Sequence, residues 1–340
     1  MALRAPDIAL DLGTTNTMVY VRKRGVLINE PTLLVTSASD RLNFKAVGQE
    51  AGMLLGRTTD ALVTVHPLRD GAVEDFEATA TLVRYFIRNA IGSNYLFSKP
   101  RVVVSVPVNL PEVSRKALIE AVRMGGCKKV YLVEKPLAAA IGSGLPVYEP
   151  VGSMVVDVGG GTTDIAVVSM GGIVTARSIQ VGGHKMDEAI MNYLKSTSSL
   201  MIGERTAENV KIDLAAAIPM ETNRKVRIRG RDSLSAHAMD VEFTAAQAYE
   251  AVKEPCMAIR DGIRWVLERT PPELAADVMR TGIHLTGGGS RLFGLDQYIG
   301  RELSLPVLQA RQPEDCTITG LGHILDHQEL MESLIRNNEQ

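Results

Sequence analysis

One stretch decides the fold of this chain: Met154-Val155-Val156-Asp157-Val158-Gly159-Gly160-Gly161-Thr162-Thr163-Asp164-Ile165-Ala166-Val167-Val168. Two apolar runs flank three glycines, a pattern that predicts a buried strand, a tight turn and a second strand. Glycines let backbone N–H groups approach an anion, and the threonine hydroxyls can add hydrogen bonds. The turn therefore suits phosphate, with Asp157 at the strand end placed to hold a hydrated magnesium ion. A single copy would also fit an ordinary tight turn.

A second copy of the pattern favours the phosphate interpretation. At an offset of 146 (157 minus 11) and without gaps, the segment 8–21 repeats the apolar run, Asp11, a turn with Gly13 and a second apolar run. The next turns also agree, since Gly25 falls on Gly171. Two related hairpins predict two similar α/β domains that present phosphate-binding turns to a shared cleft.

The composition fits a globular protein of two domains. The chain has 340 residues, 45% of them hydrophobic, and its net charge of −2 gives no reason to expect a nucleic-acid partner. Cys127, Cys256 and Cys316 lack the spacing of a zinc site or a disulfide framework, so we expect buried or half-buried free thiols. No signal peptide fits before the first strand and no apolar run reaches about 18 residues, so the expected location is cytoplasmic.

The first half of the chain alternates strand and helix patterns, which indicates α/β layers. Strands are predicted at 25–28 and 32–35, interrupted by Asn29-Glu30-Pro31, and a small insertion follows from about 37 to 67. A helix is expected after Asp75, because apolar residues then recur at helical spacing.

Strands at 101–107 and 130–133 enclose a helix that begins near Pro111, and another helix begins near Pro136. Beyond the central hairpin, the pattern predicts a helix with Met186 on its apolar face and a second helix from Thr206.

The last third contains a basic strand pattern, a capping box and a third glycine turn. Basic residues alternate with apolar ones in the region 223–243; a basic patch is one interpretation, and a half-buried strand with a solvated basic face is the favoured one. Thr244 begins a capping box, and Pro255 is expected to split or bend the helix that follows. A strand then delivers Gly287-Gly288-Gly289-Ser290, a turn that opens a helix, and the chain after Cys316 is predicted to be helical.

Four motifs occur in one order: Asp-Leu-Gly-Thr at 11–14, Val-Ser-Val-Pro at 104–107, Asp-Val-Gly-Gly-Gly-Thr-Thr-Asp at 157–164 and Leu-Thr-Gly-Gly-Gly-Ser at 285–290. Together they resemble the actin-like ATPase superfamily, and within it most closely the MreB family of bacterial actins. The stretches 69–71, 200–208 and 270–274 look like that family specifically. The resemblance covers about residues 5–325.

The resemblance implies an α/β fold of two ribonuclease-H-like (actin-like ATPase) domains around a central nucleotide cleft, each with a small inserted subdomain. The first domain would comprise residues 1–142 plus 310–340, with its inserted subdomain at about 32–68. The second would comprise residues 143–309, with its inserted subdomain at about 184–243.

The resemblance also implies ATP and Mg²⁺ as cofactors, with Asp11 and Asp157 facing the metal through water. The residues implied for nucleotide binding are Gly13, Thr14, Thr15, Asn16, Gly159, Gly160, Gly161, Thr162, Gly182, Gly183, Glu208, Lys211, Gly287, Gly288, Gly289 and Ser290. Among them, Glu208 and Lys211 would border the base or ribose, and the third glycine turn would lie against the adenosine. The positions implied for the chemistry are Glu134, Lys135, Asp157 and Thr162.

Members of the family polymerise into membrane-associated filaments and help to determine cell shape by positioning cell-wall synthesis. The implied partners are therefore further copies of this chain, the inner face of the cell membrane, and cell-wall synthesis and morphogenesis proteins. The membrane contact would be made by Leu96 and Phe97, although from physical chemistry alone these residues fit an ordinary buried turn better.

One departure from the family pattern concerns the chemistry. The family usually has Glu-Glu-Pro where this chain has Glu134-Lys135-Pro136, and the glutamate next to the proline orients the attacking water. A charged lysine cannot accept a hydrogen bond from water, whereas it can contact phosphate oxygens. We therefore expect ATP binding with slow hydrolysis. Glu134 is not expected to substitute, because a neighbouring residue at a helix start points about 100° away.

Two other departures leave the nucleotide site intact. His184 stands where the family commonly has Asp; with no second ligand at metal spacing, it is expected to be a surface or interface residue. The stretch Ser233-Leu234-Ser235-Ala236-His237 also differs, which puts contacts along a filament in doubt.

Three alternatives to a hydrolysing, filament-forming bacterial actin remain open. One is a nucleotide-locked scaffold that does not hydrolyse ATP or form long filaments. A second is a small-molecule kinase of the same superfamily, against which Lys135 argues because a kinase needs an acidic base. A third is a free-standing chaperone nucleotide domain, for which the chain has no substrate-binding domain.

Overall fold

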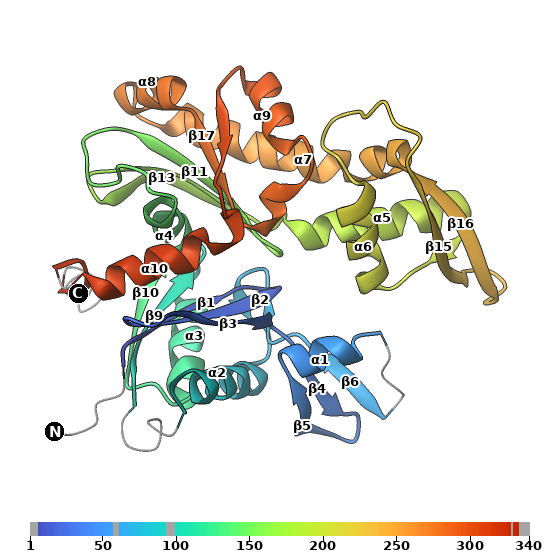
Figure 1. Cartoon of the computed structure of the whole chain (residues 1–340), viewed down its shortest axis with the longest axis horizontal. Coiled ribbons are helices and arrows are strands. Elements are labelled where there is room, and N and C mark those ends of the chain that lie inside the picture. The colour runs from blue at the N-terminus through green and yellow to red at the C-terminus, as the bar shows by residue number, and fades with distance from the viewer. Residues whose placement is uncertain (1–5, 57–60, 93–98, 328, 333–340) are drawn as a thin grey trace.

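Two five-stranded mixed sheets organise the molecule (Figure 1). The computed structural model describes residues 6–56, 61–92, 99–327 and 329–332. The first sheet has the order β10-β9-β1-β2-β3, with bounds Lys129–Glu134, Arg101–Val106, Ile8–Leu12, Asn16–Val21 and Gly25–Pro31. The second has the order β13-β12-β11-β17-β18, with bounds Gly172–Ile179, Thr163–Ser169, Ser153–Val158, Ile283–Thr286 and Val307–Gln309.

The two predicted hairpins are confirmed and occupy matching places in the two sheets. β1 pairs antiparallel with β2 and parallel with β9, and β11 pairs in the same way with β12 and β17. Asp11 and Asp157 each lie one residue before the end of their strand. Every residue of β1 and β11 is buried except Asp11, which is partly exposed.

 The two hairpins therefore lie in the buried centres of their sheets, and each turn lies where its first strand ends.

Two helices separate the sheets. α4 (Lys135–Gly142) and α10 (Cys316–Asp326) lie between them in Figure 1. Ile318 and Leu321 of α10 pack with Ala9 and Val103 of the first sheet, whereas Ala139 of α4 packs with the second sheet. The two halves therefore share an interface made by these helices.

The outer faces of the sheets are covered by longer helices. α2 (Phe76–Ile91) and α3 (Glu112–Met124) pack with the first sheet in one apolar core. α7 (Ala245–Arg269) packs with the second sheet, near α8 (Pro272–Thr281) and α9 (Leu295–Leu303). Asp75 caps α2 by accepting a hydrogen bond from the backbone of Ala78, as its position before the helical pattern predicts.

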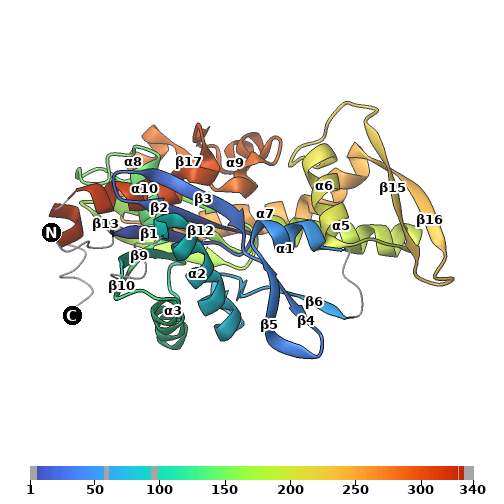
Figure 2. The same cartoon turned by 60° about the horizontal axis from the view of Figure 1, so that its bottom comes forward.

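Each half also carries a smaller sheet. The order in the first is β5-β4-β6 (Asp40–Val47, Leu34–Ser37 and Leu62–Val65), next to α1 (Gln49–Leu54). The order in the second is β14-β15-β16 (Leu200–Met201, Lys225–Asp232 and Ala238–Thr244), next to α5 (Gly183–Ser198) and α6 (Glu204–Leu214). Both lie toward the same side of the molecule in Figures 1 and 2. A two-stranded sheet, β7 (Leu68–Arg69) with β8 (Ala72–Val73), completes the first half.

Several local predictions are confirmed. Thr244 and Gln247 form the capping box of α7, and α4 begins at the predicted proline. In β15, Arg227 and Arg229 are exposed and pair with Asp240, while Ile228 is buried, so the strand has the expected solvated basic face. The three cysteines are free and buried.

One local prediction is wrong, and two others are made more specific by the structure. β3 continues to Pro31 without the expected interruption, because it is an edge strand, where proline is tolerated. Pro255 does not split α7, which runs through it as one helix with Pro255 buried against the core. The third glycine turn opens the short 3₁₀ helix η2 (Gly288–Arg291) rather than an α-helix. Among the described residues, no helix combines the length and hydropathy needed to cross a membrane.

Candidate functional site

The turns of the two hairpins lie against each other. A Cβ atom on Gly160 would overlap the hydroxyl of Thr15, and one on Gly161 would crowd the hydroxyl of Thr14. The backbone N–H of Gly71, between β7 and β8, donates to Thr14 Oγ1 at 3.3 Å. Both predicted phosphate turns are therefore brought together, and glycine is required where they meet.

The start of α5 is joined to the second turn by backbone hydrogen bonds. Gly183 N donates to Gly159 O at 3.0 Å, and His184 N donates to Gly160 O at 2.9 Å. A Cβ atom on Gly182 would lie 2.5 Å from Gly159 O, so no side chain fits there. The Nε2 atom of His184 lies 3.0 Å from Thr15 Oγ1 in the other half of the molecule. His184 therefore lies at the contact between the two halves.

Three carboxylates and one ammonium group lie together beside the turns. Asp11, Asp157 and Asp164 come from β1, β11 and β12, and Lys135 is the first residue of α4. Nζ of Lys135 lies 3.4 Å from Asp11 Oδ1, and Lys135 is only 8% exposed. Asp157 and Asp164 act on the same ammonium group electrostatically. We call these four residues the carboxylate–lysine cluster.

Hydrogen bonds hold each carboxylate of the cluster in place. Ser105 donates to Asp11 Oδ1, and Thr286 donates to Asp157 Oδ1 at 2.9 Å. Asp164 accepts from the hydroxyl of Thr162 at 3.0 Å and from the backbone N–H of Val108 at 3.1 Å.

Ser105, Thr286 and Asp164 are not among the residues predicted to form the site. A signal for them was present, because each belongs to one of the four motifs at 104–107, 157–164 and 285–290.

Burial and neighbouring charges shift the pKa values of the cluster residues in opposite directions. Burial raises the pKa of Asp157 to about 7, although the cation of Lys135 lowers it. Burial also raises the pKa of Asp164 against the effect of Lys135. Burial acts to lower the pKa of Lys135, but the three carboxylates outweigh it, so this pKa is raised above its ordinary value. Lys135 is therefore a cation at neutral pH.

Glu134 points away from the cluster. Its carboxylate accepts a hydrogen bond from Arg115 of α3 at 3.3 Å, and its side chain is 36% exposed. This hydrogen bond agrees with the expectation that Glu134 does not take over the water-orienting role that the family places at position 135.

The residues predicted to border the base lie on α6. Lys211 donates to Asp187 Oδ2 at 2.9 Å and to Gly183 O at 3.2 Å, so it is held toward the start of α5. Burial raises the pKa of Asp187 to about 6, against the lowering effect of Lys211. The buried Asp187 Oδ1 has no hydrogen-bond partner among the described residues. Glu208 lies on α6, as Lys211 does, and its negative charge raises the pKa of Asp187 further.

The third glycine turn packs directly on the second hairpin. A Cβ atom on Gly287 would lie 2.3 Å from Val158 O, and Gly287 adopts φ +79°. A Cβ atom on Gly289 would lie 3.0 Å from the same oxygen, whereas Gly288 faces open space. Ser290 donates to Gly287 O at 2.7 Å, which closes the turn. The second and third glycine turns are thus joined at the end of β11.

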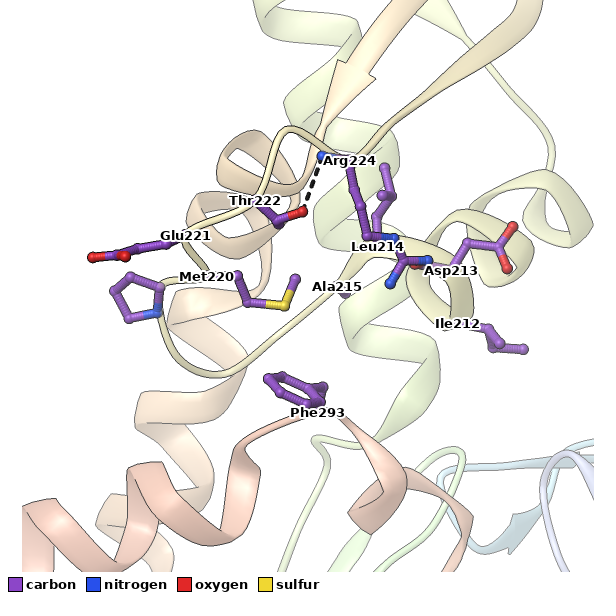
Figure 3. Close-up of a pocket in the computed structure, with 10 residues that line it drawn as sticks. Ile212, Asp213, Leu214, Ala215, Met220, Glu221, Thr222, Arg224 and Phe293 are labelled. Atoms are coloured by element: carbon purple, nitrogen blue, oxygen red, sulfur yellow. Dashed lines mark hydrogen bonds between the residues drawn. The ribbon is translucent and has the colours of Figure 1, made fainter.

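A cavity of about 570 Å³ opens at the end of α6 (Figure 3). Its lining residues come from α6, the loop after it and the segment after η2: Ile212, Asp213, Leu214, Ala215, Pro219, Met220, Glu221, Thr222, Arg224 and Phe293. None of these residues was predicted to bind nucleotide. Ala217 N donates to Phe293 O at 2.8 Å, which ties the loop after α6 to the third glycine turn. The cavity therefore borders the elements predicted to hold the base.

The cluster differs from the arrangement expected for a hydrated magnesium ion. The described residues contain no group of three or more His, Cys, Asp or Glu side chains placed to hold a metal ion. Asp11 and Asp157 do face a common space, but the ammonium group of Lys135 already supplies positive charge there. The residues present do not fit the metal in the expected way, and the roles of Asp11 and Asp157 toward Mg²⁺ stay a prediction.

Comparisons with known proteins agree with this geometry. Residues 5–333 match the family model described as MreB/Mbl protein. The chain is 45% identical to the cell shape-determining protein Mbl of Bacillus subtilis (strain 168), over 95% of this chain and 96% of that protein. It is 39% identical to the cell shape-determining protein MreB of Escherichia coli (strain K12), over 94% of this chain and 93% of that protein.

A solved structure shows the same architecture. The ADP-bound crystal structure of MreB5 of Spiroplasma citri superposes with a TM-score of 0.90 and 32% sequence identity, covering 98% of this chain and 99% of that one. The actin-like α/β fold that the family resemblance implies is thereby confirmed. This chain belongs to the MreB/Mbl family of actin-like proteins.

Proposed function

We propose that this protein binds ATP between its two halves and polymerises into membrane-associated filaments that help to position cell-wall synthesis. The observation that carries the proposal is the direct contact between two glycine turns at matching ends of matching hairpins. Because Gly160 and Gly161 meet Thr15 and Thr14, backbone N–H groups from both halves can reach one ligand. A polyphosphate is the kind of ligand that such paired turns suit.

The base and ribose would lie toward α6. The unpartnered Asp187 Oδ1 is a buried acceptor beside Lys211, and a ribose hydroxyl is a donor of the right chemistry for it. The flat surface of the third glycine turn supports the same placement, since Gly288 has no atom near its missing Cβ. The cavity next to Phe293 leaves further room beyond this point.

The relatives support the biological part of the proposal. Both the Mbl and the MreB protein compared above are named as cell shape-determining. The Spiroplasma citri protein was crystallised with ADP. Filament formation and a role in cell shape are carried over to this chain as proposals.

Hydrolysis is proposed to be slow. Lys135 stands where the family has the glutamate that orients water, and its ammonium group is engaged with Asp11. A positioned base or water-orienting group contributes about 10²–10⁴-fold in rate, so its replacement by a cation should cost a comparable factor. The protein would then remain in its ATP state far longer than a relative with glutamate at this position.

The buried ion pair of Lys135 also favours a second candidate, a nucleotide-locked scaffold that binds ATP without cycling. The two candidates share the nucleotide site and differ in whether ATP drives assembly. A small-molecule kinase is disfavoured, because no acidic base replaces Lys135 and Glu134 is engaged with Arg115.

The membrane contact is proposed for Leu96 and Phe97. Both residues lie outside the described part of the structure, and the proposal rests on the family resemblance.

Sedimentation of the full chain with ATP and with ADP, with and without anionic liposomes, tests the proposal. ATP-dependent filaments in the pellet are the expected result, and a soluble monomer that binds ATP under all conditions would favour the scaffold. Gly160→Val should abolish ATP-dependent pelleting, because its side chain collides with Thr15. Gly172→Ala is the matched control, since the nearest atom to its new Cβ would be 4.0 Å away. Thermal unfolding of both variants checks that they fold.

A further inference from the structure

The carboxylate–lysine cluster contains its own cation. Nζ of Lys135 approaches Asp11 to 3.4 Å, and their side chains are only 11% and 13% exposed. Asp157 and Asp164 are 5% and 0% exposed and act on the same ammonium group. The positive charge is therefore held among the aspartates of both halves, away from bulk water.

The carboxylates have little freedom to rearrange around a different cation. Asp157 is fixed by Thr286, and Asp164 accepts two hydrogen bonds from Thr162 and Val108. Lys135 is fixed as well, because α4 begins at this residue and packs between the two sheets. The fold consequently fixes the backbone of Lys135, and the ion pair with Asp11 holds its ammonium group.

This position is where a divalent cation would be expected. Mg²⁺ in nucleotide sites is usually bound by one or two carboxylates together with substrate phosphates, and it keeps several of its waters. Asp11 and Asp157, at corresponding places in the two hairpins, are such a pair of carboxylates. An ammonium group offers the same partners a positive charge and three hydrogen-bond donors, without a shell of water to retain.

We propose that Lys135 is a built-in counter-cation that takes the place of Mg²⁺ at the phosphates, so that this protein binds ATP with little dependence on divalent metal. The inference rests on the proposed nucleotide binding and specifies the cofactor requirement of the same site. The ammonium group offsets part of the negative charge of the aspartates before nucleotide arrives and contacts the phosphate oxygens once it is bound.

Titration of the full chain with a fluorescent ATP analogue, in excess MgCl₂ and in excess EDTA, tests the proposal. The wild-type Kd should agree between the two conditions within about threefold. Lys135→Gln, which removes the charge, should bind at least about tenfold more weakly in EDTA than in MgCl₂. Lys116→Gln is the matched control, because Lys116 is 73% exposed and pairs with Glu112 on the surface of α3; it should behave as wild type.

The wild-type measurement decides the matter even if Lys135→Gln does not fold. Binding in MgCl₂ that is lost in EDTA would overturn the counter-cation role and leave the proposed function standing. Absence of binding in both conditions would overturn both. Equal metal dependence in wild type and Lys135→Gln would also contradict the proposal, because it would show that the ammonium group does not replace the metal.

Discussion

The hydroxyl of Thr15 lies 3.0 Å from Nε2 of His184, which joins the first hairpin turn to the start of α5. The two residues are 169 positions apart and belong to different halves of the molecule. A second histidine makes a similar connection, since Nε2 of His66 lies 3.9 Å from a carboxylate oxygen of Glu204 on α6. Each of these two contacts between the halves therefore involves an imidazole side chain.

The first prediction concerns the pH dependence of stability. Burial lowers the pKa of His184 below its ordinary value of 6.5, and the nearby cation of Lys211 lowers it further. The folded state then binds fewer protons than the unfolded state, so the contribution of His184 is fully present above pH 6.5 and is lost as the pH falls. The loss cannot exceed about 1.4 kcal/mol per pH unit for one proton.

His184→Asn should therefore lose less stability than wild type on acidification from pH 7 to 5.5, as measured by urea unfolding at each pH. The quantity to compare is the difference in unfolding free energy between wild type and His184→Asn at each pH. Asp157 has a raised pKa, so its contribution changes with pH in the opposite direction, but it is present in both proteins. Parallel profiles would show that His184 is not responsible for the acid sensitivity.

The second prediction concerns hydrolysis. Lys135→Glu replaces the ammonium group with the carboxylate that the family uses to orient water, and phosphate release should rise by about 10²-fold or more. The assay is steady-state phosphate release at saturating ATP and MgCl₂. Lys116→Glu makes the same charge reversal on an exposed helix surface and should leave the rate unchanged. A wild type that releases phosphate as fast as Lys135→Glu would contradict slow hydrolysis.

The third prediction concerns the contact between α4 and α10. A Cβ atom on Gly320 would lie 1.8 Å from the carbonyl oxygen of Ala138, and one on Gly142 would lie 1.9 Å from that of Cys316. Gly320→Ala should lower the free energy of unfolding by about 1–3 kcal/mol, because overpacking outweighs the better helix propensity of alanine. Gly172→Ala, with open space at its Cβ, should stay within about 0.5 kcal/mol of wild type.

The fourth prediction concerns membrane binding. Replacing both Leu96 and Phe97 with serine should weaken co-sedimentation with anionic liposomes by at least about tenfold, because each apolar side chain contributes about 1.5–3 kcal/mol when buried. Leu234→Ser is the control, since Leu234 is 87% exposed on the second half. If Leu234→Ser has the larger effect, the membrane-facing surface lies elsewhere.

The central elements of the fold could be predicted because their signals are local. The paired hairpins follow from apolar runs and glycines that adjoin in sequence, and the cap at Asp75 lies within one turn of its helix. Pro31 misled the prediction, and Pro255 did not split its helix, because the effect of a proline depends on context. An edge strand tolerates Pro31, and the apolar core around α7 offsets the backbone hydrogen bond lost at Pro255.

The site could be predicted only in part, because some of its contacts join segments that lie far apart in the sequence. The glycine turns and their aspartates follow from motifs, and the unusual Lys135 follows from the family pattern. The contact of Lys135 with Asp11 joins segments 124 residues apart (135 minus 11), and nothing in either segment specifies it. The bond between Thr15 and His184 is of the same kind, because it exists only once both halves have folded and met.

The close approach of α4 and α10 has a mechanical consequence. At Gly142 and Gly320 the backbones of the two helices approach so closely that no side chain fits between them. Because α10 packs with the first sheet and α4 with the second, a rotation between the two halves would have to pass through these helices. The sheets β5-β4-β6 and β14-β15-β16 lie toward one side of the molecule, away from these helices (Figure 1), so a slight change of angle at the phosphates would displace β5 and β16 the most. A protein whose Lys135 delays hydrolysis would hold that angle, and with it the shape of any assembly it forms, for as long as ATP stays bound.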